Sequence, residues 1–163
     1  MNASRILYET IPVLILCGLV ELLAGTNLSR MDSLLESLPG LLIMVPPMLD
    51  LRGDINGAFA ARLSSGIHLG VIDFKRRGEI WENLKTVLFL SVVVPTLISL
   101  FSYSVCYLLS MPSITLPELL FIAVCTGLVS SMIMSVLSVA ITYASVSRGI
   151  DPDNVAIPLL ATL

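Results

Sequence analysis

The stretch Pro46-Pro47-Met48-Leu49-Asp50-Leu51-Arg52-Gly53-Asp54-Ile55-Asn56-Gly57 decides how this chain is organised, because it puts three charged side chains and an amide into an otherwise apolar sequence. A charge inside the hydrocarbon of a bilayer costs about 2.5–3.5 kcal/mol on insertion scales. A segment that carries several charges must therefore face a water-filled cavity or a partner. We expect the functional site of the chain in this segment.

The composition is that of an integral membrane protein. Of 163 residues, 56% are hydrophobic and 13% are charged, and the mean hydropathy is +0.95, whereas a soluble domain is about 25% charged. We expect one all-α transmembrane domain over residues 1–163, multi-pass in the lipid bilayer of the cell membrane. The net charge of −3, without a basic patch interleaved with aromatic residues, argues against a nucleic-acid partner.

Apolar segments along the chain predict a five-span helical bundle, since a crossing helix needs about 20 mostly apolar residues. The spans are residues 6–25, 38–70, 86–109, 118–146 and 155–163, of which the last is incomplete. Pro46 and Pro47 each remove a backbone donor, so we expect a break in the second span over residues 46–57. The polar stretches Thr26–Ser37 and Val71–Lys85 are expected to be loops.

The positions of Lys and Arg predict the orientation. Arg5, the cluster Lys75–Lys85 and Arg148 fall on one side of the expected bundle, and Arg30 falls on the other. Cytoplasmic segments carry the excess of basic residues. The N-terminus is therefore expected in the cytoplasm.

Oxygen ligands for a metal ion are concentrated in the second span. Asp50, Asp54 and Asn56 offer the carboxylate and amide oxygens that Mg²⁺ and Ca²⁺ prefer. Because Mg²⁺ gives up its water reluctantly, sparse carboxylates in a wet cavity suit a hydrated ion. In the alternative, Asp50 or Asp54 pairs with Arg52 or Arg62, which gives these arginines a structural or gating role.

A second acidic group, Asp151 and Asp153, precedes the fifth span. Asp153 or Asn154 is expected to cap the helix that follows. In the alternative, Asp151 and Asp153 form a cytoplasmic vestibule that gathers cations.

Two motifs resemble the MgtE and solute carrier 41 superfamily of magnesium transporters. They are PPMLDLRGDINGAFAARLSSGIHLG at residues 46–70 and DPDNVAIPLLATL at residues 151–163. The resemblance implies a homodimer whose ion path follows the two-fold axis, lined by the second and fifth helices. It implies transport of Mg²⁺, with Mn²⁺ or other divalent cations as further substrates, and no enzymatic activity.

The resemblance also implies roles for single residues. Asp54 takes the place of an asparagine in the family's Gly-Asn core, and Ala161 could lend a backbone carbonyl to the pore. Leu163 lies before the aspartate-containing segment of the family's last helix, so we expect a fifth helix that is C-terminally truncated.

Two other functions are open at this point. A non-conducting structural or assembly subunit of the membrane would agree with an incomplete fifth helix. A metal-dependent membrane phosphotransferase is faintly suggested by Asp54, Gly57, Arg62 and Asp73. The sequence lacks that enzyme's Asp-Gly start, because Ile55 follows Asp54.

Overall fold

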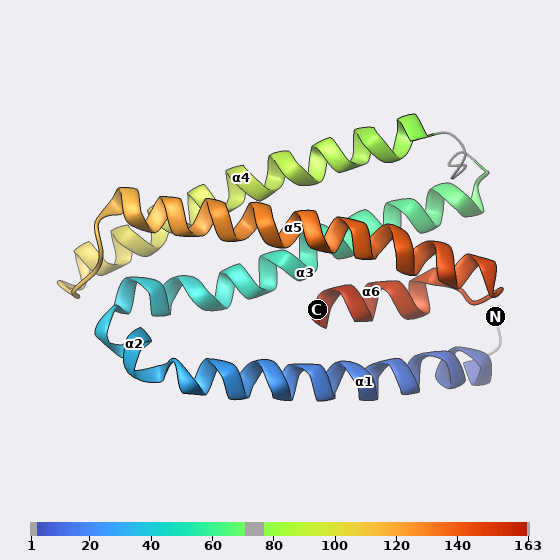
Figure 1. The fold of residues 1–163 in the computed structure, drawn as a ribbon, viewed down its shortest axis with the longest axis horizontal. Helices are drawn as coiled ribbons and strands as arrows, with labels where there is room; N and C mark the ends of the chain where they lie inside the picture. Colours follow the sequence, from blue (N-terminus) through green and yellow to red (C-terminus); the bar gives the residue numbers. More distant parts are fainter. Residues whose placement is uncertain (1–2, 71–76, 163) are drawn as a thin grey trace.

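The fold is all-helical in the part of the chain that the computed structural model describes, residues 3–70 and 77–162. Its helices, drawn in Figure 1, are α1 (Ala3–Arg30), α2 (Asp32–Ser37), α3 (Pro39–His68), α4 (Arg77–Leu108), α5 (Leu116–Ser147) and α6 (Pro152–Thr162). Within these residue ranges there is no strand. The expectation of an all-α protein is confirmed.

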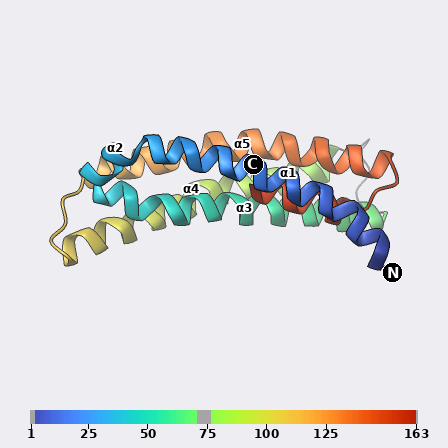
Figure 2. The same ribbon diagram turned by 90° about the horizontal axis from the view of Figure 1, so that it is seen from below.

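The four long helices run side by side along one axis, as both ribbon views show (Figures 1 and 2). The short helix α6 lies between α1 and α3 and ends near the middle of the bundle (Figure 1). The starts of α1, α4 and α6 gather at one end of the bundle, together with the ends of α3 and α5.

Helix α3 is the centre of the bundle and packs against α4, α5 and α6. Ile55, Phe59 and Leu63 form a core cluster with Val87 of α4. A second face of α3 packs through Ala60 against Met134 of α5 and against Ala156 and Leu160 of α6. Two faces of α3 are thus covered by other helices. The remaining face is open and carries the candidate site.

Helices α4 and α5 approach closely because α5 carries a glycine at the contact. A Cβ on Gly127 would lie 2.8 Å from Cγ of Pro95 and 2.9 Å from the carbonyl oxygen of Ser91. The hydroxyl of Ser91 donates a hydrogen bond across this contact to the hydroxyl of Ser131. Small residues allow such close approach between helices in membranes.

The expected break in the second span is absent. Helix α3 runs without interruption from Pro39 to His68 and contains both Pro46 and Pro47. Two prolines remove two hydrogen bonds from the helix, but both residues are exposed, so their rings are not packed into the core of the bundle. Transmembrane helices tolerate proline in this way.

The expected loops are shorter than the sequence indicated. Residues 26–37, expected as one loop, are helical at both ends, because α1 continues to Arg30 and α2 follows. Helix α4 begins at Arg77, so the second half of Val71–Lys85 is also helical. Residues 71–76 lie outside the described residues.

Three of the helices are long and apolar enough to cross a membrane: residues Leu7–Arg30, Gly78–Leu108 and Leu116–Ser147. The protein is therefore a multi-pass membrane protein. Helix α3 has 30 residues but carries four charged side chains, at Asp50, Arg52, Asp54 and Arg62. The five-span arrangement is still an expectation.

Candidate cation-binding groove

The open face of α3 forms a groove of about 380 Å³ against α6. Ile157 of α6 closes one side of this groove. The α3 side of the groove consists of two carboxylates and four small residues, namely Asp50, Gly53, Asp54, Gly57, Ala58 and Ala61.

Helical spacing brings these residues to one face. Asp50 and Asp54 are one turn apart, and Gly53, Gly57 and Ala61 repeat at the same interval of four. Both aspartates are exposed in the single chain. The sequence thus places two carboxylates beside a stripe without bulky side chains, which leaves room for a hydrated ion or a second helix.

The two carboxylates have no ion-pair partner in residues 3–70 and 77–162. The side chain of Arg62 is exposed, and Arg52 is half-buried and lines a different pocket, between α3 and α5. The pairing of Asp50 or Asp54 with these arginines, which the sequence left open, is therefore not formed within one chain. Both carboxylates are free to attract a cation.

Asn56 lies on a different face from the aspartates. Its side chain is fully buried, and its Nδ2 donates a hydrogen bond of 2.8 Å to the carbonyl oxygen of Arg52. Its Oδ1 is also buried and accepts no hydrogen bond from the described residues. The structure thus brings Asp50 and Asp54 together but leaves Asn56 in the interior of the bundle.

Ala161 lies in α6, about one helical turn after Ile157, which is the α6 residue that lines the groove. Within the described residues, no group of three His, Cys, Asp or Glu side chains is arranged to hold a metal ion. Among the described residues, Asp50 and Asp54 are the carboxylates that line the groove.

The acidic residues Asp151 and Asp153 lie at the start of α6, where Asp151 caps the helix. Oδ1 of Asp151 accepts a hydrogen bond of 3.1 Å from the backbone N–H of Asp153, so Asp151 serves as the cap, where Asp153 or Asn154 was expected. Nε2 of His68, at the end of α3, lies 3.8 Å from the same Oδ1. Asp151 and Asp153 are exposed at the end of the bundle where α1 begins.

Sequence reasoning missed the contacts that hold α6 in place. Nδ2 of Asn154 donates a hydrogen bond of 3.1 Å to Oε2 of Glu9 on α1. Sγ of Cys17 lies 3.5 Å from the carbonyl oxygen of Pro158. Glu9 and Asn154 each lie near the start of an apolar segment, and this position was a signal that they could form a hydrogen bond. Nothing in the sequence indicated that the two segments are neighbours.

Comparisons with known proteins place the chain in a family. A family model for MgtE, described as a divalent cation transporter, matches residues 45–163, which include α3 and α6. Solute carrier family 41 member 3 of Rattus norvegicus is 28% identical over 165 residues, covering 94% of this chain and 34% of the relative. Member 2 of Gallus gallus is 24% identical over 173 residues, covering 99% of this chain and 29% of the relative.

The chain spans about a third of the length of these curated relatives. No solved structure matches it significantly. The matched family consists of transporters, so the phosphotransferase alternative has no support from the comparisons. Since the family model covers well over half of the sequence, including both faces of the groove, this chain belongs to the MgtE family of divalent cation transporters.

Proposed function

We propose that this chain forms half of a Mg²⁺ transport pathway, in which two copies face each other across the groove of α3. One observation carries the proposal: Asp50 and Asp54 share an open face with small residues and have no ion-pair partner in the described part of the chain. Unpaired carboxylates at membrane depth are costly, and such residues mark ion pathways.

The chemistry of the groove fits a hydrated divalent cation. Mg²⁺ prefers oxygen ligands and keeps several of its waters, so one or two carboxylates suffice. Asp54 is the first candidate ligand and Asp50 the second, and the backbone carbonyl of Ala161 is a third ligand on the α6 side. Asn56 is buried on another face of α3, so it would support the groove from the interior and not bind the ion directly. The same ligands would accept Mn²⁺.

The small residues beside the carboxylates support a homodimer. Gly53 and Gly57 form the spacing at which membrane helices approach closely, and Ala61 extends it. No atom outside the local helix backbone lies within 4 Å of the position of a Cβ on Gly57. In a dimer related by a two-fold axis, this face of α3 would meet its own copy, and four carboxylates would line the path along the axis.

The remaining parts of the proposal concern the two ends of the path. The five-span domain would have its N-terminus in the cytoplasm, so the end where α1 begins would be cytoplasmic. Asp151 and Asp153 lie at that end and would gather cations as a vestibule. Arg62 is exposed two turns beyond Asp54 and would repel a cation there, which is a gating role.

The test is Mg²⁺ flux in liposomes that contain the purified chain and an entrapped Mg²⁺ indicator. The wild type is expected to conduct, and Asp54→Ala to lose most of the flux. Asp32→Asn is the matched control, because Asp32 is an exposed carboxylate on α2. Flux that is unchanged in Asp54→Ala would refute the assignment of the site, whereas a wild type without flux would favour a non-conducting subunit.

A further inference from the structure

A second cavity lies on another side of α3 and is separate from the groove. It has a volume of about 350 Å³, within the roughly 300–1,000 Å³ typical of small-molecule pockets. Its walls come from α3, α4 and α5, with Leu35 of α2 at one end. Asp50 and Asp54 do not line it.

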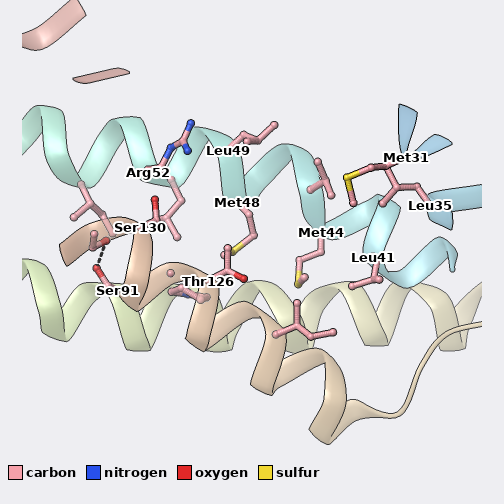
Figure 3. Close-up of a pocket in the computed structure, with 17 residues that line it drawn as sticks. Met31, Leu35, Leu41, Met44, Met48, Leu49, Arg52, Ser91, Thr126 and Ser130 are labelled. Atoms are coloured by element: carbon pink, nitrogen blue, oxygen red, sulfur yellow. Dashed lines mark hydrogen bonds between the residues drawn. The ribbon is translucent and has the colours of Figure 1, made fainter. Parts of the chain in front are cut away.

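The cavity has one polar end and one apolar end (Figure 3). Ser91 and Ser130 lie at the first end, where Arg52 of α3 also lines the cavity with its guanidinium group directed away from the two serines, and Met31 and Leu35 lie at the second. Met44 and Met48 of α3 lie between them. The unbranched thioether side chain of methionine adapts to irregular apolar ligands.

Arg52 supplies the positive charge of this cavity. Its Nε is buried and has no hydrogen-bond acceptor among the described residues. The hydroxyls of Thr126 and Ser130 likewise have no partner within residues 3–70 and 77–162. A buried cationic donor without an acceptor is unfavourable, and an anion at this position would satisfy it.

We propose that the cavity binds a long-chain fatty acid, with its carboxylate at Arg52 and its acyl chain along Met48 and Met44 toward Met31. The guanidinium group matches a carboxylate geometrically and forms charge-assisted hydrogen bonds with it. From Leu41 to Ile55 the cavity follows α3 over about 21 Å, since a helix rises 1.5 Å per residue. This volume is suited to one extended chain rather than to the two chains of a phospholipid.

The test uses hexadecanoic acid that carries a diazirine, with cross-links mapped by mass spectrometry on the purified full chain. Peptides of α3 and α5 are expected to carry the label. Unlabelled hexadecanoate should compete about tenfold better than hexadecanol, because the alcohol lacks the negative charge and the second acceptor oxygen of the carboxylate. Equal competition by the two compounds, better competition by a diacyl phospholipid, or label confined to residues that do not line the cavity would overturn the proposal.

Variants of three residues separate binding from folding. Arg52→Gln should lower labelling about tenfold and abolish the preference for hexadecanoate, whereas Arg52→Lys should retain that preference. Thr126 lies on the rim of the cavity. Thr126→Phe should block labelling, because the larger side chain would fill part of the cavity. Arg62→Gln is the control, because Arg62 does not line the cavity. Labelling that is unchanged in both Arg52→Gln and Thr126→Phe would contradict the proposal, even if one of the two variants folds poorly.

Discussion

Asp50 and Asp54 lie one helical turn apart on α3 and open into the same groove, opposite Ile157 of α6. Like charges at this spacing destabilise a helix by about 0.2–0.5 kcal/mol. In the described residues no arginine or lysine offsets this repulsion. The arrangement is therefore one that a divalent cation would stabilise.

We expect Mg²⁺ to raise the thermal stability of the purified protein. Binding to the folded state stabilises it by about 2.7 kcal/mol when Mg²⁺ is at 100 times its Kd. The shift should vanish in the double variant Asp50→Asn/Asp54→Asn and persist in Asp32→Asn. The measurement is the unfolding temperature in detergent with MgCl₂, compared with choline chloride at equal ionic strength. An equal shift in the double variant would exclude the groove as the binding site.

Gly57→Leu is expected to abolish dimerisation without disturbing the single chain. No atom outside the local helix backbone lies within 4 Å of a Cβ at this position, so the new side chain would project into the groove. Gly18→Leu on α1 is the matched control, because that position is equally open. Single-molecule photobleaching in liposomes would count the copies per particle. A dimer that persists in Gly57→Leu would show that the groove is not the interface.

The sequence indicated the location of the candidate site, because charges in an apolar segment are rare and have few explanations. The hydropathy pattern also gave the long helices. It could not show that Asp54 and Asn56, two residues apart, lie on different faces, since the expected break at Pro46 and Pro47 hid the helical register. The neighbours of α3 were not predictable either, because they depend on tertiary contacts such as that of Ala60 with Leu160.

Gly127→Ala should destabilise the contact between α4 and α5. The added methyl group would lie 2.8 Å from Cγ of Pro95, so the helices must separate. Overpacking of this kind costs about 1–3 kcal/mol. This destabilisation is measured as the loss in free energy of unfolding in detergent. Gly25→Ala is the control, because its position is open. A loss no larger than that of Gly25→Ala would mean that the two helices can move apart freely.

Asn154→Ala should loosen α6 from α1, because Glu9 then loses the hydrogen bond from Nδ2 of Asn154. Such bonds contribute about 0.6 kcal/mol on average in membranes and up to about 1.7 kcal/mol. Hydrogen exchange over α6 should become faster. Glu9→Gln retains an amide oxygen that can accept the bond and should have the smaller effect. If hydrogen exchange in Glu9→Gln were as fast as in Asn154→Ala, the charge of Glu9, and not the hydrogen bond alone, would hold α6 against α1.

The central claim is that a negative charge at position 54 attracts the transported cation. Asp54→Cys in a Cys125→Ser background provides the test, since Cys125 is exposed, whereas Cys17 and Cys106 are buried. Mg²⁺ flux into liposomes is measured after reaction with a thiosulfonate that adds either a sulfonate or a trimethylammonium group. Recovery of flux with the sulfonate alone is predicted. Equal flux after the two reagents would contradict the account.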